Sequence, residues 1–329
     1  MTRMRSWILH MVCTGLAVLC ATTPALAQPA PWPVKPIRLV VPFPPGGSSD
    51  IAARIVAPKL AERLGQPVLV ENRPGAGGSL GLVQVSKAPA DGYTLVLAAA
   101  GALTISPSLV KNLGYDVAND FSPITGFGAS PFVLIANDGL AASNVGEVIK
   151  LARSQPGKLS FGSGGNGTAM HLAGEQMKAM SESYILHIPY RGSSPAVTAV
   201  MSGEVPLGVT DLTSIAGKTG SGRLKVLGVM SQQRSALAPD TPTLSESGLP
   251  GFEASGWFAV LGPAQLPAPI TARLNKEITG LLRSSEVRER FLAVALEPMP
   301  TTPDELMQFI RDESTKWARV IQRAGVRVD

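Results

Sequence analysis

The sequence predicts an α/β protein in which strands of parallel sheets alternate with helices. Mainly apolar runs of strand length, such as 37–41, are followed by glycine-rich turns and then by apolar residues at helical spacing. This unit recurs in two series, within 37–99 and within 144–230. With 329 residues, 45% of them hydrophobic and 16% charged, the chain is long enough for two domains. We expect the two domains to face each other with a ligand site between them.

The first 27 residues have the pattern of a cleaved export signal. Arg3 and Arg5 precede an apolar run over 7–20, and small residues end the segment at Ala27. The apolar run is short for a membrane anchor, and a lipoprotein site at Cys20 would need a small residue where Leu19 stands. We therefore expect cleavage after Ala27 and a periplasmic protein.

Export also changes the composition of the functional chain. Both cysteines, Cys13 and Cys20, lie in the signal, so thiol catalysis, thiolate metal sites and disulfides are excluded from the mature protein. The signal contains two arginines and no acidic residue, so the net charge falls from +5 to +3. A charge this small and diffuse argues against nucleic acid as a partner.

In the first series, the β-branched run 37–41 predicts a buried strand closed by Pro42. The turn 44–50 then opens a helix with apolar residues at 51, 55, 56 and 60, and Gly65 ends it. The next strand is expected at 68–70, followed by a turn-rich loop with Ser79 as the helix cap. Strand 93–99 ends this series.

The second series repeats the alternation. Its expected elements are helix 144–155, strand 159–161, loop 162–167, helix 168–180, strand 185–188, a helix starting near 194–195, and strands 205–210 and 224–230. The remaining chain is helical in pattern, with helices expected at 269–283, 285–293 and 303–324.

The turn at 45–50, Pro-Gly-Gly-Ser-Ser-Asp, joins a strand to a helix and is a candidate anion site. Its glycines let a ligand approach the main chain, and the unpaired N–H groups of the first helical turn point at that ligand. The same residues would equally serve as a helix cap in which Ser48 or Ser49 satisfies those N–H groups.

A second glycine turn, 162–168, matches G-x-G-x-x-G between a strand and a helix. This pattern is typical of dinucleotide sites, but the acidic residue expected after the next strand is missing and Tyr190 and Arg191 stand there. Arg191 would suit a 2′-phosphate. Export argues against a soluble nicotinamide cofactor, so we expect no cofactor.

Catalytic and metal-binding patterns are also missing. The mature sequence has two histidines, His171 and His187, and no G-x-S-x-G turn. We expect His171 to orient the glycine loop and His187 to be a core residue. Two histidines without cysteines do not favour zinc, and we expect neither a metal nor an enzyme.

Several motifs together resemble the Bug-type substrate-binding receptors of tripartite tricarboxylate transporters. They are VPFPPGG at 41–47, ENRPGAGG at 71–78, ADGYTL at 90–95, IPYRGS at 188–193, PDTPT at 239–243, ESGLPG at 246–251, WF at 257–258 and KWA at 316–318. They run in order across 33–329, which makes the resemblance more specific than any one motif.

The resemblance implies a periplasmic binding protein of type II, with two α/β domains joined by a hinge around a ligand cleft. It places domain 1 at 33–128 plus 253–329 and domain 2 at 129–252. Such receptors bind a small organic carboxylate through backbone amides and deliver it to transporter membrane subunits, and we expect this one to be a monomer. The ligand-binding residues expected here are Phe43, Pro45, Gly46, Gly47, Ser48, Asp50, Ser163, Gly164, Gly165, Asn166, Gly167, Thr168, His171, Tyr190, Thr210 and Asp211.

Two departures from the family pattern bear on the ligand. The stretch 98–103 is Ala-Ala-Ala-Gly-Ala-Leu where polar side chains are frequent in the family, and Thr210-Asp211 replaces a frequent Asp-Asn pair. They suggest a ligand less polar than aspartate, such as an apolar or aromatic carboxylate near Phe43 or Tyr190. Alternatively, both are packing changes away from the ligand. An exported α/β enzyme and a receptor that signals to a sensor kinase remain the rival functions.

Overall fold

The computed structural model describes residues 32–327, and the predicted export signal and its cleavage site lie outside them. The strands are β1 Ile37–Val41, β2 Val68–Asn72, β3 Thr94–Ala99, β4 Phe121–Asn137, β5 Ser160–Ser163, β6 Leu186–Pro189, β7 Leu207–Asp211, β8 Leu224–Val229, β9 Ser255–Pro263 and β10 Glu297–Pro298. The helices are α2 Ser48–Leu64, η1 Ala76–Gly78, α3 Ser79–Ser86, η2 Gly101–Ile105, α4 Ser106–Leu109, α5 Val145–Ser154, α6 Ala169–Met180, α7 Ser193–Ser202, α8 Leu212–Ile215, α9 Ala268–Leu282, α10 Ser285–Leu292 and α11 Pro303–Ala324.

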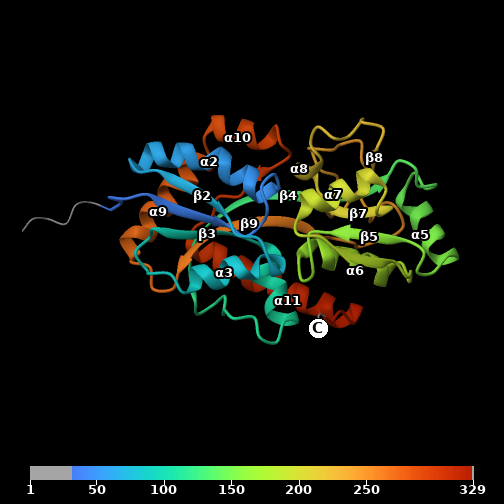
Figure 1. Cartoon of the computed structure of the whole chain (residues 1–329), viewed down its shortest axis with the longest axis horizontal. Helices are drawn as coiled ribbons and strands as arrows, with labels where there is room; N and C mark the ends of the chain where they lie inside the picture. The colour runs from blue at the N-terminus through green and yellow to red at the C-terminus, as the bar shows by residue number, and fades with distance from the viewer. Residues whose placement is uncertain (1–31, 328–329) are drawn as a thin grey trace, which may run out of the picture. The chain divides into compact units, whose positions relative to one another are not determined.

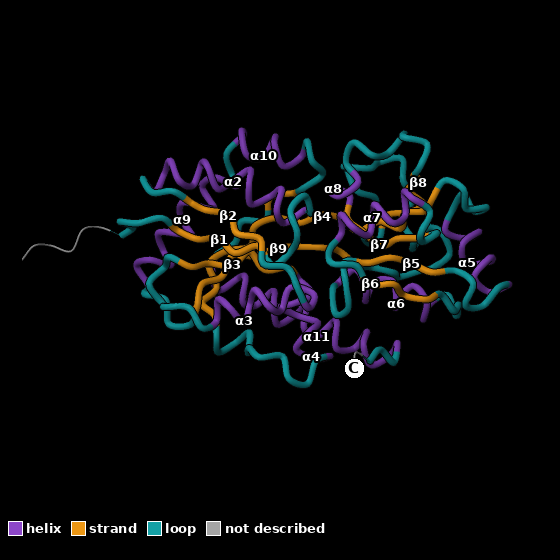
Figure 2. The backbone as a smooth tube through the Cα atoms, in the orientation of Figure 1, coloured by secondary structure: helices purple, strands orange, loops and turns teal. Residues whose placement is uncertain are grey.

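The strands form one path in the order β2-β1-β3-β9-β4-β7-β5-β6, with β8 and β10 also paired to β4 (Figure 2). At each end of the path the pairing is parallel, as predicted: β1 with β2 and β3, and β5 with β6 and β7. In the middle, β9 is antiparallel to β3 and β4, and β4 is antiparallel to β7. The sheet is therefore mixed, and the expectation of purely parallel sheets is wrong at its centre.

Strand β4 belongs to both halves of this path. Its first part, Phe121 to Pro131, pairs with β9, and its last part, from Phe132, pairs with β7 and β8. The pairing with β9 contains two register shifts, at Pro123/Thr125 and at Gly126/Gly128. Such irregularities bend a strand and increase its twist.

Helices cover both faces of the sheet (Figure 1). In the first half, α2, α9 and α10 pack together on one face, while α3, η2 and α11 lie on the other. In the second half, α7 and α8 cover one face and α6 packs on the opposite one. Side chains of β4 alternate accordingly: Val133 and Ile135 join the core under α7, and Phe132 and Leu134 join the core that α6 covers.

The predicted helix boundaries follow local capping chemistry. Helix α2 ends at Gly65, which adopts the left-handed conformation with φ 70°. The Thr168 side chain accepts a hydrogen bond from the His171 amide and caps α6, and Thr302 with Glu305 forms a capping box at the start of α11. These helices therefore begin and end where their own residues dictate.

Three local expectations differ from the structure. The cap of α3 is Gly78, with φ 102°, and not Ser79, which is the first helical residue and contacts the Tyr115 hydroxyl. Strand β5 continues through Ser163, so the loop after it begins at Gly164 and not at Gly162. The long strands β4 and β9 were not predicted from the sequence.

Within 32–327, no helix combines the length and apolar character needed to cross a membrane.

Candidate binding site

A cavity lies where the two halves of the sheet meet, and loops from both halves line it. Its space not filled by atoms is about 640 Å³, including the part open to solvent. The lining residues fall into four groups, the turn before α2, the start of η2, the first turns of α6 and α7, and the facing parts of β4, β7 and β9. The site is therefore built mainly from helix N-termini.

The first helix N-terminus on the cavity is that of α2. The Gly46 N–H is not available to a ligand, because it donates to Asp50 Oδ2 at 2.9 Å. Asp50 also accepts hydrogen bonds from Arg54 and Asn72, so it holds the turn and does not face the cavity. Within the described chain no acceptor is present for the N–H groups of Gly47, Ser48 and Ser49, all three of which line the cavity. These three groups are hydrogen-bond donors without a partner at the positive end of the α2 dipole, an arrangement that favours an anion.

The pKa of Asp50 reflects its role in the turn. Burial, the largest influence, raises that pKa, but the hydrogen bonds from Arg54, the Gly46 amide and Asn72 together lower it below its ordinary value. The carboxylate is thus ionised and fully engaged inside the turn, next to the positive end of the α2 dipole.

The second helix N-terminus on the cavity is that of α6. Inside the preceding loop, the Gly165 N–H donates to Ser163 Oγ at 3.2 Å and the Gly167 N–H to His171 Nδ1 at 3.3 Å. These glycine amides therefore hold the loop together. The N–H groups of Ala169 and Met170, in the first turn of α6, have no acceptor in the part of the chain described, and both residues line the cavity.

A third N-terminus, that of α7, completes the arrangement and was missed in the sequence. The N–H groups of Ser193 and Ser194 have no acceptor among the described residues, and both serines line the cavity. Ser194 Oγ donates to the Gly46 carbonyl at 2.6 Å across the cavity. The signal was present, since Gly192 separates a strand from a helix just as the two recognised glycine turns do.

Most of the other residues on the wall are apolar. Phe43, Phe132, Trp257 and Phe258 are its aromatic residues, and the small residues Ala99 to Gly101 lie on the same cavity. The indole of Trp257 donates to Glu313 Oε2 at 3.4 Å, and the buried Trp317 indole donates to the same oxygen at 3.2 Å. No lysine, arginine or histidine of the described chain lines the cavity.

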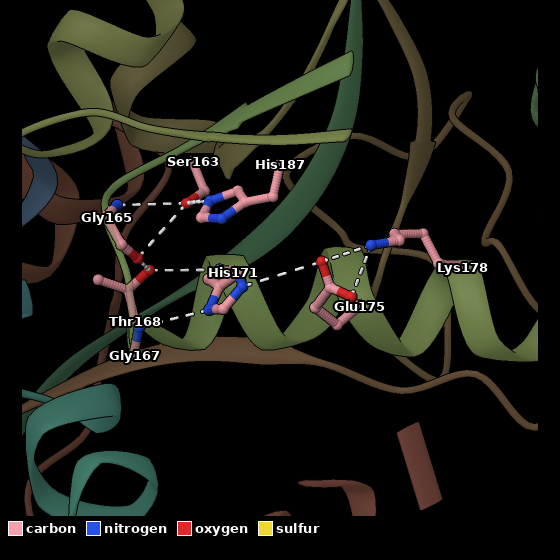
Figure 3. A network of polar contacts seen from close by, with 8 residues as sticks. All are labelled: Ser163, Gly165, Gly167, Thr168, His171, Glu175, Lys178 and His187. Atoms are coloured by element: carbon pink, nitrogen blue, oxygen red, sulfur yellow. Dashed lines mark hydrogen bonds and ion pairs between the residues drawn. The ribbon is translucent and has the colours of Figure 1, made fainter. Parts of the chain in front are cut away.

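A polar network under the α6 loop holds the second turn in place (Figure 3). The rings of His171 and His187 stack with centroids 4.0 Å apart, and His187 Nε2 lies 2.6 Å from Ser163 Oγ. Ser163 in turn accepts from Gly165, and His171 from Gly167. Figure 3 shows that Glu175 and Lys178 continue the network along α6 and away from the loop. His171 therefore positions the glycine loop, as predicted, and His187 is a half-buried residue whose ring nitrogen is satisfied by Ser163.

This histidine pair should make the protein less stable in acid. Burial, with the positive charge of Lys178 as a smaller influence, lowers the pKa of His171 to about 4. Burial, then the charges of His171 and Lys178, lower the pKa of His187 to about 3. The unfolded chain binds these protons near pH 6.5, so the free energy of unfolding falls as the pH drops from 6.5 towards 4, by about 1.4 kcal/mol per histidine per pH unit.

Denaturant unfolding at pH 7, 6, 5 and 4.5 measures this loss. His187→Gln keeps a polar group beside Ser163 but does not titrate, so its stability should decline less steeply than that of the wild type. Carboxylates contribute equally to both proteins, so the difference in slope isolates the histidine. If the free energy of unfolding falls equally steeply with pH in both proteins, His187 does not have the lowered pKa on which this prediction depends.

The structure divides the predicted site residues into three groups. Those on the cavity are Phe43, Gly47, Ser48, Gly164, Thr168 and Asp211. Gly165, Asn166 and Tyr190 line a second cavity, which shares Phe43, Gly77 and Gly164 with the first. The residues that line neither cavity are Pro45, Gly46, Asp50, Ser163, Gly167, His171 and Thr210.

No group of three or more histidine, cysteine, aspartate or glutamate side chains with metal-binding geometry occurs within 32–327.

Comparison with known proteins relates this chain to one family of receptors. Residues 52–326 match the model of the tripartite tricarboxylate transporter family receptor. Protein BugT of Bordetella pertussis is 37% identical over 95% of this chain and 97% of its own length.

Among solved structures, periplasmic binding protein BugD matches with a TM-score of 0.86 and 33% identity, over 90% of this chain and 99% of that one. Rpa4515 of R. palustris with adipate matches with a TM-score of 0.88 and 31% identity, over 90% and 99% of the two chains. MatC from Rhodopseudomonas palustris with bound malate matches with a TM-score of 0.84 and 28% identity, over 88% and 100%.

Proposed function

Because the chain belongs to the receptor family of the tripartite tricarboxylate transporters, we propose that it binds a small organic carboxylate and delivers it to transporter membrane subunits. The family and the similar structures are periplasmic solute-binding proteins of the same mixed α/β fold. The observation that carries the proposal is the convergence of the α2, α6 and α7 N-termini on one cavity. Helix N-termini favour negative charge through both their free N–H groups and their dipoles.

The binding energy that these backbone N–H groups can supply suits a receptor that binds its ligand and then releases it. A hydrogen bond from an N–H to a carboxylate contributes about 1.5–3 kcal/mol net, so three or four of them exceed the cost of ordering the ligand. Micromolar affinity corresponds to about −8 kcal/mol. Backbone donors also leave no unpaired charged side chain behind when the ligand departs, which eases release.

The proposed movement is a closure of two lobes, 33–128 with 253–329 and 129–252, around the ligand. Two hydrogen bonds between the proposed lobes support it, from Ser194 Oγ to the Gly46 carbonyl and from Ser48 Oγ to Asp211 Oδ2 at 3.1 Å. Each joins the first lobe to the second. We further propose that the protein acts in the periplasm as a monomer after removal of the signal.

The ligand is proposed to carry an apolar body. No cationic side chain of the described residues lines the first cavity, and aromatic residues and alanines form much of its wall. Arg191 lines the second cavity, which shares three residues with the first, and is the cation that a second carboxylate would have to reach. The similar proteins Rpa4515 and MatC are described with adipate and malate, so a second carboxylate is an alternative that must be tested.

Thermal unfolding of the purified protein with adipate, hexanoate, benzoate, malate and aspartate tests the proposal. We expect hexanoate or benzoate to give the largest stabilisation, about 2.7 kcal/mol at a concentration of 100 times Kd. The matching neutral amides, hexanamide and benzamide, are the controls and should stabilise little, because they lack the anion. Stabilisation by aspartate alone would contradict the apolar body, and no stabilisation by any carboxylate would contradict the function.

Uptake of the stabilising carboxylate by cells with and without the gene separates a transport receptor from one that serves a sensor. Loss of uptake on deletion is expected. Unchanged uptake together with a changed transcriptional response would favour the sensor.

A further inference from the structure

Asp211 is a buried acid inside a cavity that otherwise favours anions. It ends β7, begins α8 and is 1% exposed. Its Oδ1 accepts the Ser214 N–H at 2.8 Å and its Oδ2 accepts the Ser48 hydroxyl at 3.1 Å. It lines the cavity together with the first turns of α2, α6 and α7, and it is the only titratable side chain of the described residues that does so.

The groups that face Asp211 are nearly all neutral. Helix α2 presents Ser48, α7 presents Ser193, and β4 presents Phe132, all on the same cavity. The one nearby charge is Lys218, after α8, whose ammonium group donates to the Ser214 carbonyl. Burial, the largest influence, raises the pKa of Asp211 above its ordinary value, although Ser214, Ser48 and Lys218 each lower it.

An ionised Asp211 and a bound carboxylate would repel each other in this enclosed space. The N–H groups of three helices favour the ligand's charge, whereas the charge on Asp211 is favoured by hydrogen bonds from Ser214 and Ser48 and by Lys218. A proton on Asp211 removes the repulsion. It also converts the acid into a hydrogen-bond donor, because Oδ2 can keep accepting from Ser48 while its O–H group points into the cavity.

We propose that Asp211 is protonated whenever a carboxylate ligand occupies the cavity, so that ligand binding takes up a proton from the solvent and ligand release returns it. This inference rests on the proposed function and specifies the charge state that its site accepts. The only bond that changes is the O–H bond on Asp211, whose proton comes from water or buffer. Asp211 then adds no negative charge to that of the ligand, whose carboxylate the N–H groups face.

Calorimetric titration in buffers of different ionisation enthalpy measures the protons taken up. The probe is whichever of adipate, hexanoate, benzoate and malate stabilises the protein most, titrated at half-unit steps from pH 6 to 9. In the wild type, uptake should rise towards one proton per site above the pKa of the free protein. The association constant should fall by up to tenfold per pH unit there.

Asp211→Asn cannot take up the proton, so its proton uptake should vanish and its affinity should no longer depend on pH. Asp240→Asn, which removes an exposed carboxyl with no recorded contact, is the matched control and should keep the wild-type uptake. His171 and His187, with pKa values of about 4 and 3, stay neutral throughout this range.

The possible outcomes separate the two proposals. Binding of a probe by the wild type without proton uptake at any pH overturns the inference and leaves the proposed function standing. Proton uptake that persists in Asp211→Asn also overturns it. Failure of every probe to bind defeats the proposed function itself. If Asp211→Asn does not fold, the wild-type buffer series still decides whether a proton is taken up.

Discussion

Replacing Gly101 with valine is expected to reduce carboxylate affinity by more than 100-fold. Gly101 begins η2, where the first half of the sheet meets the N-terminus of α6. A Cβ at this position would lie 2.8 Å from the Ala169 nitrogen, 2.9 Å from Thr168 Cα and 3.0 Å from the Gly167 carbonyl oxygen. All three are backbone atoms, which cannot rotate away, so η2 and α6 must separate.

The separation moves the free N–H groups of α6 away from those of α2. Hydrogen bonds weaken steeply with distance, so two or more of the donors proposed to hold the ligand would be lost. Calorimetric titration measures the affinity, and circular dichroism checks that the variant is folded. Gly101→Ala should give an intermediate loss, because its single methyl group demands a smaller shift.

Gly146→Val serves as the control for adding the same side chain elsewhere. Gly146 is exposed in α5, and a Cβ there meets only ordinary contacts of 3.4 Å or more. Its affinity should equal that of the wild type. A folded Gly101→Val protein with wild-type affinity would show that the contact between η2 and α6 does not shape the binding site.

Ser48→Pro is expected to weaken carboxylate binding by about 10- to 100-fold, which corresponds to the loss of one hydrogen bond from an N–H to an anion. Ser48 is the first residue of α2, and proline is well tolerated there because that N–H has no partner within the helix. The preceding Gly47 has φ −83° and ψ 167°, which is the extended conformation that a residue before proline prefers. The substitution therefore removes one donor from the cavity with little strain.

Ser48→Ala is the matched control. It removes the same hydroxyl, and with it the hydrogen bond to Asp211, but keeps the N–H group. Comparison of the two variants by calorimetry isolates the backbone donor, and Ser48→Ala should lose much less affinity than Ser48→Pro. Equal losses would mean that the side chain, and not the amide, contributes to binding.

The elements that the sequence predicts well are those whose boundaries depend on their own residues. Three of the five residues of strand β1 are β-branched, and α2 starts after a glycine pair and is capped by Gly65, so both are local properties. The error at Ser79 is also local, because the positive φ of Gly78 caps α3 in place of a side chain.

Strands β4 and β9 could not be predicted in this way. β4 contains Pro123, Gly126, Gly128 and Pro131, residues that normally interrupt strands, and its pairing with β9 shifts register twice. Its conformation depends on partners more than 100 residues away, and no local pattern reports them.

The binding site, like the fold, was predictable only where local residue patterns mark it. The first two glycine turns are visible because each lies between an apolar strand and a helix. The sequence could not reveal that the amides of Gly46, Gly165 and Gly167 are bonded inside their own loops, because those bonds depend on side-chain positions. The N-terminus of α7 became recognisable as part of the site only when the fold placed it opposite α2.

The sharing of β4 between the two halves of the sheet has a mechanical consequence. A single uninterrupted backbone is hydrogen-bonded to β9 as far as Pro131 and to β7 and β8 beyond it. Sliding one half past the other would break many of these ladder bonds at once, whereas flexing where the ladder changes partner breaks few. The molecule should therefore resist shear and yield to bending, with its softest point beside the ligand cavity at Pro131 and Phe132.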